Sequence, residues 1–215
     1  MLVPKKQPRP VCARCLRPMP QCLCAHVPRL SNLTRVLILQ HPDEAKHPLN
    51  TARLAAMGLQ SAELLIGEYF PQLAGAIASV ESAFLLFPAK SEDVSQLPSM
   101  PRPEEPSLLI VPDGTWRKAR KIIHANPVLG TLPRLSLPPG EPSEYRIRKA
   151  REPAAVSTIE AIVRSLSLLE PERDFQPLLK PFRVLVEQQV RAMGEEVYRR
   201  NYQGRTCSDP ERAKT

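Results

Sequence analysis

The chain has 215 residues, 42% hydrophobic and 24% charged, so we expect one main soluble domain with a true core. Its formal net charge is +8, and its 25 prolines are more than double the usual share of about 5%. No apolar run approaches the ~18 residues of a membrane span, and no signal peptide is expected. The composition therefore excludes a membrane protein, a secreted disulfide scaffold, a coiled coil and a collagen-like chain. We expect a soluble, basic, cytoplasmic protein whose length suits a single α/β domain.

Positive charge is concentrated in two blocks. Residues 1–42 contain seven Lys/Arg and no acid, and residues 114–151 contain nine Lys/Arg against two Glu. A solvated surface would explain one basic run. Two separate runs on a neutral-to-acidic body are typical of a protein that binds a polyanion, and we predict nucleic acid as the partner.

Hydrophobic periodicity predicts a mostly parallel α/β sheet, because apolar strands alternate with amphipathic helices. Short apolar runs predict buried strands at 35–40, 83–87 and 107–111. Helices are expected over 51–57, 116–124, 158–169 and 178–198. Asn50 is placed to cap the first of these helices, and Ser157 with Glu160 has the spacing of a capping box.

Three of the predicted helices carry explicit expectations about burial. In the helix that begins after Ser157, the expected apolar stripe is Ile159, Ile162, Val163, Leu166 and Leu169. In the 116–124 helix, Trp116, Ala119 and Ile123 are expected to face inward, and the basic side chains to face solvent. The 178–198 helix is expected to bury Phe182, Leu185, Val186, Gln189 and Met193. The flanks are expected to be a basic tail at 1–11 and a polar tail at 201–215, around a catalytic domain at 31–200.

Four of the five cysteines fall within thirteen residues, as Cys12, Cys15, Cys22 and Cys24. Zinc takes four thiolates tetrahedrally, and two close pairs of cysteines are how a short segment supplies them. Disulfides are the alternative, but they do not suit a reducing compartment. We predict a structural zinc knuckle over 12–30, with His26 as a less favoured substitute ligand.

Asp113, Gly114, Thr115 and Trp116 follow a predicted strand and precede a predicted helix. Ligands of open α/β sheets bind beyond the carboxyl ends of strands, so Asp113 is a candidate base or hydrogen-bond acceptor. On position alone, capping of the helix is the commoner use of Asp113 or Thr115. Trp116 is equally well explained as a core residue and as a stacking platform for a base.

The second unusual motif is Ser143-Glu144-Tyr145-Arg146-Ile147-Arg148. Its alternating pattern suits an extended segment, and arginine forks bind carboxylates or phosphates bidentately. No P-loop and no Gly-x-Gly-x-x-Gly fingerprint is present, so neither a nucleoside triphosphate nor a dinucleotide is indicated.

Together these motifs resemble the DTW-domain family of tRNA-uridine aminocarboxypropyltransferases, in its bacterial type. The resemblance covers roughly residues 12–170 and adds three further motifs to those above: His41-Pro42 with Glu44, Asn50-Thr51-Ala52-Arg53-Leu54, and Phe87-Pro88-Ala89. Together, the motifs Asp-x-Thr-Trp and Ser-x-Tyr-Arg-x-Arg are specific for this family, whereas either motif alone would be weak evidence for it.

The resemblance implies a SPOUT-like α/β fold with a C-terminal trefoil knot. It implies that S-adenosylmethionine gives its 3-amino-3-carboxypropyl group to N3 of a tRNA uridine, releasing 5′-methylthioadenosine. The variable loop is the expected site in tRNA, and the protein is expected to be a monomer or a homodimer.

This chemistry assigns roles to individual residues. We predict Asp113 as the base and Arg146 as the cation that meets the donor carboxylate or a phosphate. Donor-binding residues are expected to be Thr115, Trp116, Ser143, Tyr145, Arg148 and Thr158. Residues expected to contact RNA are Asn50, Thr51, Arg117, Lys118, Arg120, Lys121, Arg14 and Arg17.

Three alternatives remain open at the level of sequence. A SPOUT-type RNA methyltransferase would use the same donor but release S-adenosylhomocysteine. A non-enzymatic zinc-knuckle RNA-binding module would bind RNA with salt-sensitive affinity and no affinity for S-adenosylmethionine. A modifier of ribosomal RNA would differ only in substrate.

Overall fold

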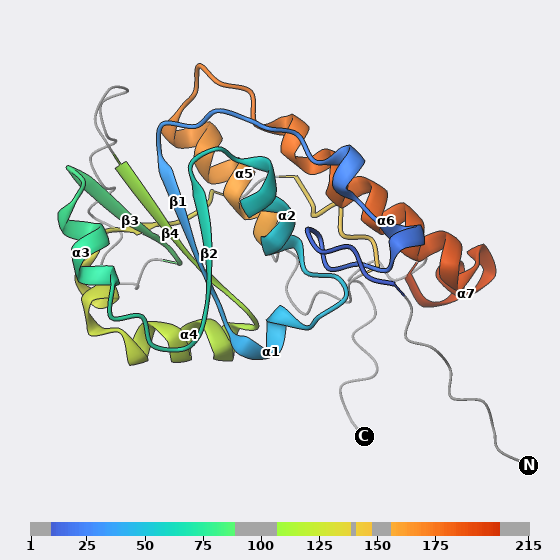
Figure 1. The fold of residues 1–215 in the computed structure, drawn as a ribbon, viewed down its shortest axis with the longest axis horizontal. Coiled ribbons are helices and arrows are strands. Elements are labelled where there is room, and N and C mark those ends of the chain that lie inside the picture. Colours follow the sequence, from blue (N-terminus) through green and yellow to red (C-terminus); the bar gives the residue numbers. More distant parts are fainter. Residues whose placement is uncertain (1–9, 89–106, 139–140, 148–155, 203–215) are drawn as a thin grey trace, which may run out of the picture.

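The computed structural model describes residues 10–88, 107–138, 141–147 and 156–202, shown in Figure 1. Most of both predicted tails, the Pro-rich stretch around 98–106 and Arg148 lie outside the described residues. Among the described residues, no helix has the length and hydropathy needed to cross a bilayer.

A five-stranded sheet forms the centre of the molecule, in the order β2-β1-β4-β3-β5, with every pair parallel. The strands are β1 (Arg35–Gln40), β2 (Ala62–Ile66), β3 (Ser82–Leu86), β4 (Ser107–Asp113) and β5 (Arg134–Leu135). The mostly parallel sheet and the three predicted strands are confirmed. Two strands were missed because β2 is a half-exposed edge strand with no fully buried position and β5 has only two residues.

Helices cover both faces of the sheet. They are α1 (Pro42–Ala45), α2 (Thr51–Gly58), α3 (Leu73–Ala78), α4 (Trp116–Ala125), α5 (Thr158–Leu169), α6 (Lys180–Met193) and α7 (Glu195–Tyr202). Short 3₁₀ turns lie at Met19–Gln21, Cys24–His26, Pro127–Thr131 and Gln176–Leu179. The helices α2, α5 and α6 lie on one side of the sheet, and α3 and α4 on the other (Figure 1).

Alternation along the central strands builds a separate core on each face. Val36 and Ile38 pack with α2 and α5, whereas Leu37 and Leu39 pack against the α3–α4 side. The predicted caps are confirmed: Asn50 accepts from the Arg53 N–H, and Ser157 forms the full capping box with Glu160. The apolar stripe of α5 is fully buried, as its spacing predicted.

Three local predictions are wrong. Trp116 does not face inward; it is 45% exposed, and Ile122, not Ile123, is the fully buried isoleucine of α4. The predicted 178–198 helix breaks at Gly194, whose positive φ of 83° separates α6 from α7, and Gln189 is only half-buried. The described part of the motif that begins at Ser143 forms a bend and a turn instead of an extended segment.

The connections that follow the two neighbouring strands β1 and β4 leave towards opposite edges of the sheet. After β1 it passes through α2 on one face to β2, and after β4 it passes through α4 on the opposite face towards β5. Adjacent parallel strands whose connections leave in opposite directions create a crevice at their carboxyl ends, where α/β proteins bind ligands. The SPOUT assignment and the trefoil knot stay predictions.

Candidate active site

Gln40 and Asp113 end the two strands that flank this crevice. They are partners in register, and both project from the face that packs against α2 and α5. The Gln40 side-chain amide donates to Asp113 Oδ2 at 2.7 Å, and the Thr158 hydroxyl donates to Asp113 Oδ1. Asp113 is 8% exposed, and two neutral donors hold its carboxylate.

Two helices begin at this carboxylate. Asn50 caps α2 and exchanges two 3.1 Å hydrogen bonds with Gln40, while Thr158 is the first residue of α5. The partial positive charge at helix N-termini stabilises an anion placed there. The strand ends and helix starts therefore converge on a fixed, negatively charged group.

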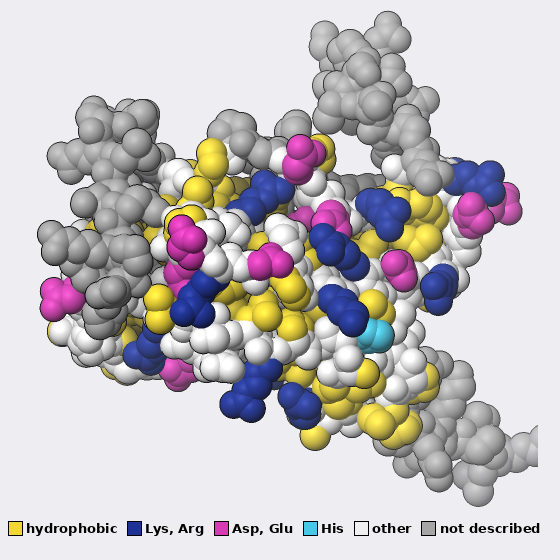
Figure 2. Space-filling view, turned by 90° about the horizontal axis from the view of Figure 1, so that it is seen from above, with side chains coloured by type: hydrophobic (Ala, Val, Ile, Leu, Met, Phe, Trp, Pro, Cys, Tyr) yellow, Lys and Arg dark blue, Asp and Glu magenta, His cyan; other side chains and the backbone are white. Residues whose placement is uncertain are grey.

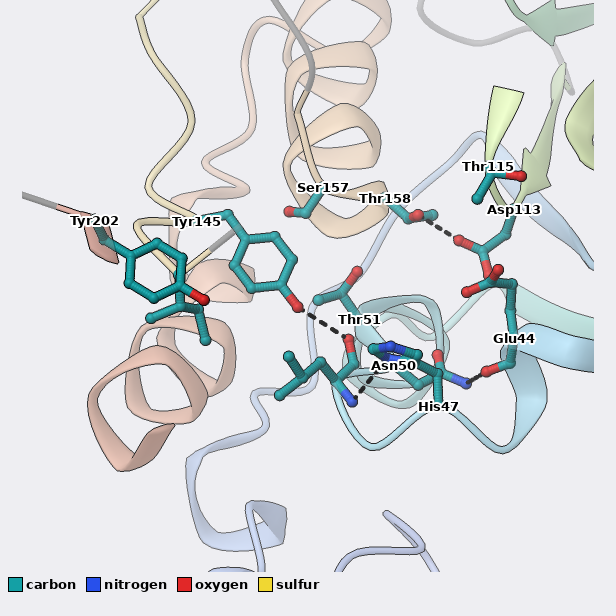
Figure 3. Close-up of a pocket in the computed structure, with 13 residues that line it drawn as sticks. Glu44, His47, Asn50, Thr51, Asp113, Thr115, Tyr145, Ser157, Thr158 and Tyr202 are labelled. Atoms are coloured by element: carbon teal, nitrogen blue, oxygen red, sulfur yellow. Dashed lines mark hydrogen bonds between the residues drawn. The ribbon is translucent and has the colours of Figure 1, made fainter. Parts of the chain in front are cut away.

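A cavity of about 610 Å³ opens beside Asp113, within the size range of small-molecule sites. Figure 3 shows its walls, which come from the loop after β1, the start of α2, the segment after β4, Tyr145, the start of α5 and the end of α7. The lining residues are Glu44, His47, Leu49, Asn50, Thr51, Asp113, Gly114, Thr115, Tyr145, Ile147, Ser157, Thr158 and Tyr202.

Charge in the cavity is mainly negative. Glu44 and Asp113 both line it, and Lys118 Nζ approaches Glu44 Oε1 at 2.8 Å from the first turn of α4. The hydrogen bond with Glu44 raises the pKa of Lys118, which keeps this ammonium charged. A ligand with a cationic centre and a few polar groups would fit such a lining.

Gly114 allows the chain to pass tightly from β4 into α4. A Cβ at this position would lie 2.9 Å from the Lys118 Cβ, which is closer than real Cβ contacts. A larger residue would displace Lys118 and its contact with Glu44. The glycine of the Asp113-Gly114-Thr115-Trp116 motif is therefore explained by packing at the site.

Glu160 holds the second motif against α5. Its buried carboxylate accepts from the Ser143 hydroxyl and the Glu144 N–H, both at 2.7 Å, in addition to capping through Ser157. Ser143 in turn accepts from the Tyr145 N–H at 3.1 Å. The capping box thus does more than start a helix, because it also fixes the backbone that presents Tyr145 to the cavity.

The remaining residues of this motif lie in different places. Tyr145 packs edge-on against Phe182, with its hydroxyl 3.5 Å from the Leu49 carbonyl. Arg146 is exposed and does not line the cavity, and Arg148 lies outside the described residues. Of the predicted donor-binding set, Thr115, Tyr145 and Thr158 line the cavity, whereas Ser143 and Trp116 do not.

The four cysteines form one cluster, in which all Sγ atoms lie within 4.8 Å of one another. The Cys12–Cys24 and Cys15–Cys22 sulfur pairs are 3.6 and 3.7 Å apart. Four sulfurs around a tetrahedral zinc at about 2.3 Å are about 3.8 Å apart, so the donor set fits this ion. Backbone N–H groups of Cys15 and Arg14 lower the pKa of Cys12 to about 6, whereas burial raises the pKa of Cys24.

Arg17 joins the cysteine cluster to the cavity wall. It is 6% exposed, and its guanidinium donates to the Gln21 carbonyl at 3.1 Å, the Pro48 carbonyl at 2.7 Å and the Gln188 side chain. Pro48 directly precedes the lining residues Leu49 and Asn50. The expectation that Arg17 faces RNA is therefore wrong, because its donors are used inside the protein; Arg14 is exposed as expected.

The predicted RNA-binding cations of α4 divide into two groups. Arg117, Arg120 and Lys121 are exposed, whereas Lys118 turns towards Glu44 and the cavity. Asn50 and Thr51 line the cavity, as side chains that orient a ligand would. Trp116 contacts Phe87 edge-on at 5.5 Å between ring centroids and remains partly exposed beside the site.

Sequence reasoning missed several members of the site, among them Gln40, His47, Leu49, Ile147 and Tyr202. One signal was available for Gln40, a polar residue at the carboxyl end of a strand whose four central residues are apolar. None existed for Tyr202, which reaches the cavity from a helix end that the sequence placed in a polar tail.

The chain matches a known protein family and several characterised proteins by sequence. A model described as the DTW domain matches residues 9–190. The chain is 30% identical over 189 residues to tRNA-uridine aminocarboxypropyltransferase 2 of Drosophila melanogaster, covering 83% of this chain and 74% of that one. The protein of the same name from Macaca fascicularis is 31% identical, with 85% of this chain and 64% of that one covered. No solved structure matches.

Proposed function

Since the chain belongs to the DTW-domain family, we propose that it transfers the 3-amino-3-carboxypropyl group of S-adenosylmethionine to N3 of a uridine in tRNA. The observation that carries the proposal is the doubly held Asp113 carboxylate beside a cavity of suitable size. The relatives' names specify uridine and tRNA. We propose the variable loop as the target region and the cytoplasm as the location.

The donor supplies a sulfonium with three activated carbons, of which the aminocarboxypropyl carbon is transferred. Selecting this carbon over the less hindered methyl group is a matter of orientation, which a rigid pocket provides. The carboxylates of Glu44 and Asp113 suit the positive charge of such a donor. Thr115, Tyr145 and Thr158 would orient it. Since Arg146 does not line the cavity, Arg148 is the proposed partner of the donor carboxylate.

Asp113 is the proposed base for the uridine. Gln40 and Thr158 each donate a hydrogen bond to one oxygen of this carboxylate, which also lines the cavity. Asp113 would accept the N3 proton as N3 forms its bond to carbon and the carbon–sulfur bond electrons return to sulfur. Gln40 and Thr158 keep the carboxylate aligned during this transfer.

The cysteine cluster is the proposed structural zinc site. Four protein ligands leave no open position for chemistry, so its role is to fold the 12–30 segment. Through Arg17 this segment supports the loop that forms one wall of the cavity. The SPOUT-like class and its knot are proposed for the same domain.

The test is to incubate the purified protein with S-adenosylmethionine and tRNA from a strain that lacks its gene. Mass spectrometry of nucleosides is expected to find aminocarboxypropyl-uridine, with methylthioadenosine as coproduct. A methylated nucleoside with S-adenosylhomocysteine would replace the proposal by RNA methylation. Neither product, with no donor binding, would favour a non-enzymatic RNA-binding module.

A further inference from the structure

The exposed side of α4 is a continuous cationic face with an aromatic residue at one margin. Successive helix residues are rotated by about 100°, which places Trp116, Arg120, His124, Arg117 and Lys121 side by side in that order. All five are exposed. Among the described residues, neither Arg117 nor Arg120 forms a salt bridge, and Lys121 pairs only with Glu68 at 2.7 Å.

A second exposed aromatic residue lies beyond the other margin. Tyr69 is 66% exposed, the highest value among the large hydrophobic side chains described. It follows Glu68, whose carboxylate accepts from Lys121, the last residue of the cationic face. Tyr69 thus follows a residue that contacts one margin of this face, and Trp116 lies at the other margin.

The backbone around Tyr69 is held rigidly on α4. Asn126, at the end of that helix and 3% exposed, donates to the Glu68 carbonyl and accepts from the Phe70 N–H at 2.7 and 2.8 Å. Phe70 is buried in the core beneath. An exposed ring on a fixed backbone has already lost much of the freedom that binding would otherwise remove.

This face differs from the opposite side of the molecule. Figure 2, which views the α5–α6 side, shows Lys and Arg interspersed with Asp and Glu. On α4 the positive charge gathers in one strip next to the cavity, since Thr115 lines the cavity and Trp116 begins the helix.

We propose that this strip binds an unpaired segment of the tRNA, with one base stacked on Tyr69 and another on Trp116, and phosphates on Arg117 and Arg120. Aromatic stacking with flanking cations is how proteins bind single-stranded RNA. The inference rests on the proposed function for its choice of tRNA. It adds Tyr69 as a substrate-binding residue and unpaired bases as what the surface recognises.

Binding of tRNA without the donor tests this directly, by filter binding over a range of salt concentrations. Tyr69→Ala is expected to raise the Kd by about 5- to 150-fold, because one stacked base contributes about 1–3 kcal/mol. Its salt dependence should stay that of the wild type. Arg120→Gln should weaken binding and reduce the salt slope by about 0.7–0.9.

Matched controls separate stacking from general damage. Tyr69→Phe keeps the ring and should bind like the wild type, as should Leu168→Ala, an exposed apolar residue on α5. Unchanged affinity of Tyr69→Ala, or an unchanged salt slope for Arg120→Gln, would overturn the proposal.

Trp116 gives a second readout, because it is the only tryptophan in the chain. Saturating tRNA is expected to quench its fluorescence, and an unaltered spectrum would contradict stacking there. These assays need no turnover. Tyr69-dependent binding by a protein without transferase activity would refute the proposed function alone, whereas activity with Tyr69-independent binding would refute this inference alone.

Discussion

Gln40 and Asp113 are neighbours in register at the ends of the two central strands, joined by a 2.7 Å hydrogen bond from the Gln40 amide to Asp113 Oδ2. Gln40 is itself held by Asn50, which caps α2. The position of the proposed base is thus fixed by the sheet and by the start of a helix, both rigid elements.

Replacing Asp113 by Asn should lower turnover by about 10²- to 10⁴-fold, the range for loss of a general base. The fold should persist, because an Asn carbonyl can accept from Gln40 while its amide donates to the Thr158 hydroxyl. Binding of tRNA should be unchanged. Steady-state rates and filter binding check both expectations, and near-normal turnover would remove Asp113 as the base.

Cys15→Ser should abolish metal binding and lower thermal stability, because Cys15 is the buried member of the cluster. Elemental analysis of the wild type is expected to find about one zinc per chain. An exposed apolar substitution on the same segment, Met19→Ala, should keep the metal. A metal-free wild type of full stability would contradict the zinc assignment.

Arg17→Gln should destabilise the protein by about 2 kcal/mol, since its guanidinium makes buried hydrogen bonds to two carbonyls. Zinc content should stay normal, while the KM for donor should rise because the Pro48–Asn50 wall loses its support. Arg14→Gln, on the same segment but exposed, provides the matched control. Equal free energies of unfolding of the two variants in urea would refute the stabilising role of Arg17.

The ion pair between Glu144 and Arg183 predicts a pH-dependent contribution to stability. The hydrogen bond from Arg183 lowers the pKa of Glu144, so the pair stabilises the folded protein above the ordinary glutamate value of about 4.3. That contribution is lost as pH falls through the lowered folded-state pKa. Both side chains are 45% exposed, which limits the effect to about 0.5 kcal/mol.

Arg183→Gln should therefore be less stable than the wild type at pH 7, and the difference should shrink as the pH falls below the ordinary glutamate pKa. Denaturant unfolding at low salt would measure this difference, with Arg191→Gln on the same helix as control. A difference that persists undiminished at acid pH would show that the effect does not come from the carboxylate.

The sheet was predictable wherever hydrophobic runs were long and fully buried. The strand at 107–111 and the helix caps at Asn50 and Ser157 depend on local chemistry, so sequence alone located them. The edge strand β2 carries no such signal because its side chains are only half-buried. Trp116 was misplaced because helix periodicity predicts a side, but not whether the sheet extends far enough to cover the first turn.

The site was only partly predictable for a different reason. Asp113, Tyr145 and Thr158 stood out through their motifs, but their meeting point depends on tertiary contacts. Arg17 is the clearest example of a residue whose surroundings the sequence does not predict. Its sequence context is a basic, cysteine-rich segment typical of an RNA contact, yet it is buried by Pro48 and Gln188, residues distant in the chain.

Which carbon of the donor sulfonium reaches RNA is the central question. S-adenosylmethionine labelled with carbon-14 in its carboxyl group and with tritium in its methyl group would be incubated with the protein and tRNA. We predict that carbon-14 enters the tRNA while tritium stays in methylthioadenosine. Tritium in the tRNA with no carbon-14 would contradict the account and make the protein a methyltransferase.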